Sequence, residues 1–531
     1  NRINPIEDGW ESEAFSESAT KILKSMAKKM VNPEKIKTDT FNVFFDNKIE
    51  PILEINPKIF SEVFRDEDFL IRSGDVDSCD IDQNPNLSFK AFLSTFSSST
   101  NLQTGIKLYK VNIKGDQVTS DVKLQVSGLS TNGVKQINCD LICQWTPKIK
   151  SPLLKSIKLK EYEESTRLSE KGLTLFSDFT DSVMSGNDSY NQQILRSTDY
   201  WRSRIPSNLG LDVVANHGLA IGDVNGDGLE DIYICQQGGL PNLLYIQNEN
   251  GTLMDHTSSS GADWLEYCSS ALIIDIDNDG DRDLVIGQDF KLLFMENDGT
   301  GSFVLSFGTS SHAQTFSLSA SDFDLDGLID IYACGYNPSA NRSRSGALGE
   351  PIPYHDAQNG GRNMLLRNKG NWDFEDVTAK VGLDHNNNRF SFASAWEDFD
   401  NDGDLDLYVA NDYGRNNLYR NNSGKFADVA GEMGVEDMSA GMSASWGDFN
   451  RDGYMDLYVS NMFSAAGNRI TFQRQFKPSA TSQMKAQYQR HARGNTLFQG
   501  TKEGGFQDVS IEQEVTMGRW AWGSRFVDLN N

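Results

Sequence analysis

The sequence has 531 residues, of which 38% are hydrophobic, and a net charge of −26 at pH 7 with an isoelectric point near 4.6. The length predicts two or more domains, and the hydrophobic content excludes wholesale disorder. The acidity excludes nucleic acid as a partner and favours bound cations, because nucleic-acid binders present basic faces. No apolar run is as long as a membrane span, so we expect no transmembrane segment.

Residues 1–165 predict an α+β domain. Residues 14–31 place apolar side chains three and four apart, which is typical of a helix, and a second helix is predicted around residues 50–70. Long alternating runs such as TGIKLYKVNIKGD and QVTSDVKLQVSGL follow, and they predict a curved antiparallel sheet. This order weakly resembles the NTF2/SnoaL-like fold, a cone that either holds a small ligand or is filled and structural. Residues 166–205 predict a mainly helical connector.

Residues 206–531 repeat a nine-residue pattern, D-x-[DN]-x-D-G-x-x-D. Five complete copies begin at Asp223, Asp275, Asp322, Asp398 and Asp448, and a sixth copy, which begins at Asp528, is cut off by the end of the sequence. The unit is about 50 residues long, with insertions of about 25 to 30 residues in the third and fifth copies. Five copies in register exclude a chance surface turn.

This spacing suits calcium, a hard cation that takes six to eight oxygen ligands in flexible geometry. Side chains at positions 1, 3 and 5 converge, position 7 offers a carbonyl as at Leu229 and Asp404, and the acid at position 9 closes the shell. Glycine at position 6 permits a positive φ. The predicted calcium ligands of the five sites are Asp223, Asn225, Asp227, Asp231, Asp275, Asp277, Asp279, Asp283, Asp322, Asp324, Asp326, Asp330, Asp398, Asp400, Asp402, Asp406, Asp448, Asn450, Asp452 and Asp456.

The loop is not an EF-hand, which requires a bidentate glutamate at position 12 and flanking helices. Position 12 is apolar in all five copies and lies in runs of strand character, such as DIYICQ and DLYVAN. Asparagine at position 3 of the first and fifth loops lowers their charge, and we expect weaker calcium binding there. A sixth calcium site is expected at Asp528 if its loop is completed.

Each unit also predicts four short strands, as in HGLAIGD, EDIYICQ, NLLYIQN and GTLMDHT, which is typical of a propeller blade. These segments resemble the FG-GAP/VCBS calcium-binding repeats of integrin α-chain propellers. Within that group they are most similar to the bacterial relatives of cartilage acidic protein, a family that often ends in an ASPIC/UnbV domain. The stretches HGLAIGDVNGDGLEDIYICQQGGLPNLLY, NNLYRNNSGKFADVAGEMGV and GRWAWGSRFVDLNN carry this resemblance. It implies a seven-bladed propeller that is incomplete at the C-terminus of this chain.

The two insertions, at residues 337–361 and 462–494, are predicted at the blade end opposite the calcium loops, where binding is commonly placed. The second insertion is basic and contains no acid, so it is either a helical excursion that packs over the ring or an anion-binding patch. In the first, Tyr354, His355 and Asp356 could be catalytic by composition, but we favour a role in loop packing. The candidate patch consists of Arg469, Arg474, Lys477, Lys485, Arg490 and Arg493.

The sequence therefore predicts a mainly β, calcium-stabilised propeller behind an α+β domain, secreted, periplasmic or attached to the cell surface, and acting in binding, adhesion or assembly. The expected partner is a protein, an acidic polysaccharide or another copy of the chain. Two alternatives stay open: a self-assembling surface-layer or filament component, and a lyase- or dehydratase-like enzyme that uses the axial pocket. The nucleophile and metalloprotease motifs that would indicate catalysis are missing from the sequence.

Overall fold

The computed structural model describes residues 11–96, 102–130, 133–168, 176–206, 218–338, 351–502 and 504–527. The chain divides into two compact units, residues 1–177 with 465–480, and residues 178–464 with 481–531. Part of the second insertion is thus grouped with the N-terminal residues. The sequence-based boundaries at residues 165 and 205 stay predictions. Within the described ranges, no helix is both long and apolar enough to cross a membrane.

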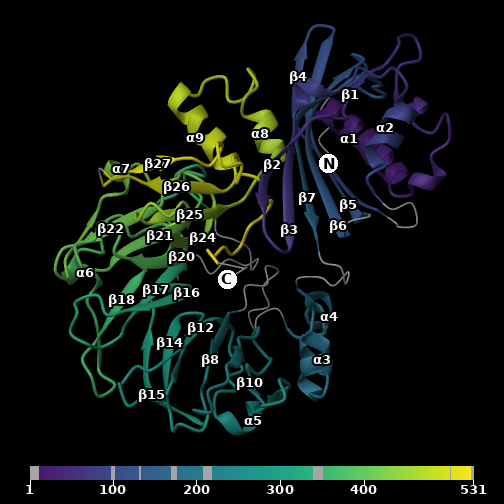
Figure 1. The fold of residues 1–531 in the computed structure, drawn as a ribbon. Coiled ribbons are helices and arrows are strands. Elements are labelled where there is room, and N and C mark those ends of the chain that lie inside the picture. The colour runs from purple at the N-terminus through teal and green to yellow at the C-terminus, as the bar shows by residue number, and fades with distance from the viewer. Residues whose placement is uncertain are drawn as a thin grey trace. The chain divides into compact units, whose positions relative to one another are not determined.

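The first unit is built on a seven-stranded sheet in the order β2-β3-β7-β6-β5-β4, with β1 parallel to β7 (Figure 1). The strands are β1 (Ile52–Glu54), β2 (Phe60–Arg65), β3 (Phe69–Gly74), β4 (Gln103–Lys114), β5 (Gln117–Ser130), β6 (Gly133–Trp145) and β7 (Leu154–Arg167). Its helical elements are α1 (Glu11–Met30), η1 (Pro33–Lys35), η2 (Asn42–Phe44), η3 (Val76–Ser78), α2 (Pro85–Leu93) and α8 (Ala465–Ile470).

The core of this unit lies between α1, α2 and the sheet. Phe15 of α1 is fully buried and meets Trp145 of β6 edge to face, with ring centroids 5.8 Å apart. The predicted helix at residues 14–31 is confirmed as α1, but the helix predicted around residues 50–70 is wrong. That segment forms β1 and the β2–β3 hairpin, because Asp66 Oδ1 accepts hydrogen bonds from the backbone of Asp68 and Phe69 and closes a turn.

The second unit contains five antiparallel sheets of four strands each, which we call blades one to five. Blades one and two comprise β8 (Leu219–Gly222), β9 (Asp231–Ile234), β10 (Leu243–Gln247), β11 (Leu253–Asp255), β12 (Cys268–Ile274), β13 (Asp283–Gln288), β14 (Lys291–Asn297) and β15 (Phe303–Ser310). Blades three to five comprise β16 (Ala313–Ser321), β17 (Asp330–Pro338), β18 (Met364–Asn368), β19 (Phe374–Asp376), β20 (Phe390–Glu397), β21 (Asp406–Asp412), β22 (Asn417–Asn421), β23 (Phe426–Asp428), β24 (Gly441–Gly447), β25 (Asp456–Asn461), β26 (Thr496–Gly500) and β27 (Phe506–Asp508).

The blades pack side by side in a propeller-like array. The first strands of consecutive blades, β8, β12, β16, β20 and β24, contact one another in order, and they lie along the inner edge of the array in Figure 1. An apolar cluster fills each junction between neighbouring blades. In β13, Ile286 packs toward blade one and Val285 toward blade three, because successive strand residues face opposite sides. The mainly β class of the prediction is confirmed, whereas ring closure and the blade number of the full protein stay predictions.

Short helices link and flank the blades. They are α3 (Thr180–Met184), the π-helical η4 (Tyr190–Ile194), α4 (Thr198–Arg202), α5 (Thr257–Ser260), α6 (Thr378–Val381), α7 (Ala430–Met433) and α9 (Ser482–Ala492). Both insertions connect the second strand of a blade to the third, as predicted. All six cysteines are free thiols, and five of them are buried.

Candidate functional site

Each copy of the nine-residue pattern forms the loop between the first and second strands of its blade. Its last aspartate is the first residue of the second strand in all five blades, for example Asp231 of β9 and Asp406 of β21. The five loops therefore lie at equivalent places, and we call this side of each blade the loop end. The sixth copy, at Asp528, lies outside the described residues.

The aspartate at position 1 organises each loop by accepting backbone hydrogen bonds. Its Oδ2 accepts the N–H of the position-6 glycine at 2.8–3.1 Å in all five loops. The position-5 acid accepts the N–H of position 7 at 2.8–3.0 Å. The position-6 glycines have φ between +85° and +100°, which confirms the predicted sharp turn. Position 4 also has a positive φ in every loop, a feature that the sequence did not predict because only one copy has glycine there.

The position-9 aspartate braces the loop against the rest of the blade. One of its oxygens accepts the N–H of position 2, and the other accepts a backbone N–H from the end of the third strand. In blade four these donors are Phe399 and Asn421, at 3.2 and 2.7 Å from Asp406. Burial, followed by repulsion from nearby aspartates, raises the pKa of Asp283, Asp330 and Asp406 to about 7.

Three of the loops bring three carboxylates close enough for one cation. In each cluster the ligand oxygens lie within 4.8 Å of one another, and the clusters are Asp275, Asp277 and Asp279; Asp322, Asp324 and Asp330; and Asp398, Asp400 and Asp406. Each cluster also contains a buried carboxylate oxygen with no hydrogen-bond partner, namely Oδ1 of Asp275, Asp324 or Asp400. Buried oxygens without donors, set among like charges, fit a hard cation such as calcium.

The first and fifth loops differ because asparagine replaces aspartate at position 3. Asn225 Nδ2 donates to Asp227 Oδ2 at 3.0 Å, and Asn450 Nδ2 donates to Asp452 Oδ2 at 2.8 Å. The amide thus supplies a hydrogen bond where an aspartate would supply repulsion. Neither loop is among the three-carboxylate clusters of the described residues. In these two loops the structure joins the predicted side chains of positions 3 and 5 by a hydrogen bond, and the loop carries one acid fewer among its predicted ligands.

Arginines from the third strands contact two of the clusters. Arg367 of β18 lies 2.7 Å from Asp324 Oδ2 and 2.9 Å from Asp326 Oδ2, and Arg420 of β22 lies 3.0 Å from Asp400 Oδ2. Both arginines are partly exposed, so these ion pairs only reduce the negative charge at the edge of the loop.

Three asparagines connect the loops to the following blade, and the sequence analysis missed them. Asn297 Nδ2 donates to the carbonyl of Val224 at 2.7 Å, across the junction from blade two to blade one. In the same way, Asn368 Nδ2 donates to the carbonyl of Ile276 and Asn421 Nδ2 donates to the carbonyl of Phe323, each at 2.8 Å. The acceptor is always position 2 of the loop of the preceding blade. The signal was an asparagine that recurs at the end of the third strand in MEN, LRN and YRN.

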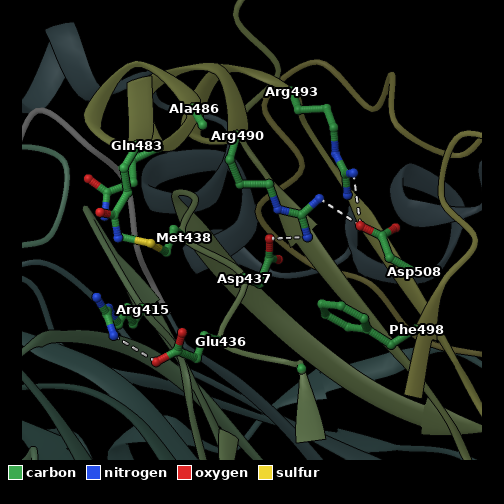
Figure 2. A pocket seen from close by; sticks show the side chains of 12 residues that line it. Arg415, Glu436, Asp437, Met438, Gln483, Ala486, Arg490, Arg493, Phe498 and Asp508 are labelled. Atoms are coloured by element: carbon green, nitrogen blue, oxygen red, sulfur yellow. Dashed lines mark hydrogen bonds and ion pairs between the residues drawn. The ribbon is translucent and has the colours of Figure 1, made fainter. Parts of the chain in front are cut away.

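The opposite end of blades three to five carries two adjoining hollows. A small polar cavity of about 220 Å³ is lined by Asp356, Gln358, Asn386, Arg389, Arg415, Asn416, Asn417, Asp428 and Glu436. A wider cleft of about 680 Å³ is lined by Arg415, Gly434, Glu436, Asp437, Met438, Gln483, Ala486, Gln487, Arg490, Arg493, Phe498 and Asp508 (Figure 2). Both are lined by Arg415 and Glu436, which form an ion pair at 2.9 Å.

The six residues of the predicted anion patch are divided between the two units. Arg469, Arg474 and Lys477 lie in the first unit, where Arg469 forms a bidentate pair with Glu13 at 2.7 and 2.9 Å. Lys485, Arg490 and Arg493 lie in the second unit. Figure 2 shows that Arg490 lies between Asp437 and Asp508, at 2.8 Å from each, and Arg493 also pairs with Asp508. The patch as a single site stays a prediction.

The predicted packing role of the first insertion fits its contacts. Tyr354 meets the rings of Tyr413 and His491 edge to face, and His355 packs on Tyr488. Asp356 instead pairs with Arg389, so the three side chains have separate partners. Burial lowers the pKa of His491 to about 4, which keeps this histidine neutral at physiological pH.

Repeated four-stranded sheets with a carboxylate-rich first loop define a mainly β repeat protein. A sequence profile of the FG-GAP-like repeat matches residues 223–286, 275–333 and 398–459. These matches support the FG-GAP family for the blades.

Cartilage acidic protein 1 of Xenopus tropicalis is 26% identical to this chain over 222 residues, which cover 39% of this chain and 31% of the relative. The match therefore spans about a third of that protein. An Agrocybe aegerita lectin structure covers 77% of this chain and 80% of its own, at 13% identity and a TM-score of 0.33. The structure titled "Rd1NTF2_04 with long sheet" matches 27% of this chain and 99% of its own chain, at 9% identity and a TM-score of 0.17. TM-scores this low support no assignment of fold or function.

Proposed function

We propose that this protein is a calcium-stabilised, FG-GAP-type propeller that acts in binding or adhesion outside the cytoplasm. The observation that carries the proposal is the set of three carboxylate clusters, each of which contains a buried oxygen without a hydrogen-bond donor. Side chains at positions 1, 3, 5 and 9 of each loop would hold the ion. We expect firm binding at the second, third and fourth loops and weaker binding at the first and fifth.

The role of the ion would be structural. The loop backbone is already ordered by its own hydrogen bonds, but the carboxylates repel one another in partly buried surroundings. A divalent cation would replace that repulsion with attraction and fix the first hairpin of the blade. In three loops the position-2 carbonyl also accepts a hydrogen bond from an asparagine of the next blade, namely Asn297, Asn368 or Asn421. A cation that fixes the loop would therefore also stabilise the junction between the two blades.

The proposed location follows from calcium supply. Loops of this flexible type bind calcium with a wide range of affinities, and the millimolar calcium outside cells saturates even weak sites. Rigid blades with long connections at one end suit binding to a protein, a polysaccharide or another copy of the chain. FG-GAP-like repeats and the partial likeness to cartilage acidic protein 1 support this class of function.

Thermal unfolding in calcium, in magnesium and in excess chelator tests the proposal. Each saturated site contributes about 3 kcal/mol at a calcium concentration of a hundred times its dissociation constant. Three such sites would raise the melting temperature by at least about 10 °C for a unit of this size. Magnesium should restore little of this loss, because it demands a smaller octahedral shell. The same melting curve in calcium and in chelator would refute the proposal.

A further inference from the structure

We propose that the polar cavity and the cleft together form a binding site for a neutral saccharide, with one sugar ring in the cavity. The inference rests on the proposed binding function and names its ligand class. The site uses the connections between blades three, four and five, which lie at the opposite end of the blades from the calcium loops.

The polar cavity offers hydrogen bonds on every side. Its nine lining residues are all polar and comprise carboxylates, carboxamides and guanidinium groups. A volume of about 220 Å³ corresponds to about seven water molecules, which leaves room for a sugar ring but not for a large cofactor. An apolar ligand would lose its hydration there without gaining apolar contact.

The cavity walls are held in place before any ligand enters. Asp428 Oδ2 accepts hydrogen bonds from Asn386 and Asn417 at 2.8 and 2.7 Å. Asp356 pairs with Arg389 at 2.8 Å and with Arg415 at 3.3 Å. Pre-organised polar groups of this kind reduce the entropy lost on binding.

The cavity wall contains buried donors without a hydrogen-bond partner, and Arg389 carries the more buried of them. Arg389 is 7% exposed and lines the cavity, and its Nε is a buried donor without a hydrogen-bond acceptor among the described residues. A buried N–H without an acceptor is unfavourable, so the Arg389 guanidinium keeps unused hydrogen-bonding capacity in the cavity wall. This unsatisfied group distinguishes the cavity from an ordinary surface hollow.

The charges around the cavity exclude the main alternatives. Asp356, Asp428 and Glu436 face two arginines, so an anion would meet more negative than positive charge. A metal ion is equally disfavoured, because Arg389 and Arg415 already occupy two of the three carboxylates. In the cleft, by contrast, three arginines face three acids and leave no net charge. A neutral ligand that both donates and accepts hydrogen bonds fits these surroundings.

The cleft provides space for further sugar residues. Gln483, Ala486, Gln487 and Arg490 are three and four residues apart in α9, so one face of this helix lines the cleft (Figure 2). Phe498 and Met438 add apolar surface, against which the C–H face of a sugar can pack. Because the Arg415–Glu436 pair borders both hollows, an oligosaccharide can extend from one into the other.

Calorimetry and saturation-transfer NMR on the calcium-loaded chain test this inference. The probes are methyl glycosides of glucose, galactose, mannose and N-acetylglucosamine, their β-linked disaccharides, and glucuronic acid as the anionic match of glucose. We expect saturable binding of at least one neutral glycoside, tighter binding of its disaccharide, and weaker binding of glucuronic acid. Failure of every neutral saccharide to bind, or a preference for glucuronic acid, would overturn the proposal.

Two exposed positions in the cavity wall allow a matched comparison. Asn386 has a φ of +58°, so Asn386→Gly removes the side chain without backbone strain, and Gln358→Ala truncates an exposed neighbour. The double variant should bind the saccharide at least about tenfold more weakly, as expected for the loss of one or two hydrogen bonds. Asn371→Gly, an exposed asparagine with a φ of +54° in the β18–β19 turn, is the control and should bind normally.

Unchanged affinity in the double variant would contradict the proposal. Melting curves of all variants in calcium establish that they fold. A negative saccharide result in calcium leaves the calcium proposal intact, whereas identical melting curves in calcium and chelator refute the calcium proposal without bearing on the cavity. The two failures can therefore be distinguished.

Discussion

The two ends of the blades hold their carboxylates in opposite ways. At the loop end, aspartates crowd together, and Asp275, Asp324 and Asp400 each retain a buried oxygen without a hydrogen-bond donor. At the opposite end, buried and half-buried acids have arginine partners from the chain, as Asp437 has Arg490 and Asp356 has Arg389. The same side chain is thus compensated internally at one end and, on our proposal, by a metal ion at the other.

This difference teaches that clustered acids alone do not identify a metal site. Asp437 is buried and close to other acids, yet Arg490 pairs with it at 2.8 Å. The informative feature is a buried oxygen that has neither a hydrogen-bond donor nor a cationic partner among the described residues, because Asp437 Oδ1 also lacks a well-aligned donor but lies beside Arg490. The comparison predicts that a substitution at the opposite end changes the free energy of unfolding by the same amount with and without calcium. A substitution at the loop end should change it by different amounts under the two conditions.

The largest effect of a single substitution is expected at the opposite end. Arg389→Met removes one of the two arginine partners of Asp356, whose side chain is 13% exposed, and should destabilise the second unit by about 3 kcal/mol, because a largely buried charge loses much of its compensation. Urea unfolding should show the same loss in calcium and in chelator. A loss that appears only in calcium would break the comparison.

The link between loop and neighbouring blade is expected to have the next largest effect. Asn421→Ala removes the bond to Phe323 and the bond that Asn421 Oδ1 accepts from Gly424, both 2.8 Å long. The buried groups left behind should cost about 2 kcal/mol. Asn422→Ala, at the exposed neighbouring position, is the control and should change urea unfolding little. Equal stability of the two variants would exclude a role for this link.

Asp412 is the exception at the opposite end, since no arginine pairs with it among the described ion pairs. It accepts hydrogen bonds from Tyr336 Oη and from the Tyr413 N–H, and burial raises its pKa to about 7. The folded state therefore binds its proton more tightly than the unfolded state, and stability falls as pH rises from about 4 to about 7. Asp412→Asn should match the wild type near pH 4 and exceed it by about 1–2 kcal/mol at pH 8 in urea unfolding. A constant difference across this pH range would contradict the assignment.

The smallest effect concerns the difference among the loops. Asp277→Asn gives the second loop the position-3 amide seen at Asn225, so it should relieve repulsion and raise stability in chelator by about 1 kcal/mol. The same substitution should reduce the additional stability gained from calcium. Asn225→Asp should do the reverse in the first loop. Paired urea titrations with and without calcium measure both changes, and equal shifts under the two conditions would show that the amide does not matter.

Much of the loop end could be predicted from the sequence. The pattern around Asp322 or Asp398 encodes its own local geometry, because the acid at position 1 bonds backbone groups only four and five residues away. The β-branched and aromatic residues that follow position 9 also indicated a strand, which placed the loop directly before the second strand of its blade. Local interactions of this kind repeat with the sequence and can be read from it.

The features that were missed depend on residues far apart in the chain. The Asn421 link spans 98 residues, and the cavity combines segments of blades three and four that lie up to 80 positions apart, from Asp356 to Glu436, so neither follows from a local pattern. The basic character of residues 462–494 suggested a free cationic patch, but the acids that pair with Arg490 lie before it at Asp437 and after it at Asp508. The helix predicted around residues 50–70 failed for a different reason, since Asp66 closes a local turn and the segment pairs as a hairpin.

Native mass spectrometry of the intact chain, titrated with calcium, tests the central claim most directly. The account predicts three ions bound firmly, at the second, third and fourth loops, and two bound more weakly at the first and fifth. Removal of one firm site by Asp398→Asn and Asp400→Asn together should lower the firm count by one. A chain that binds no calcium at millimolar concentration, or that keeps its full count in this variant, would contradict the account.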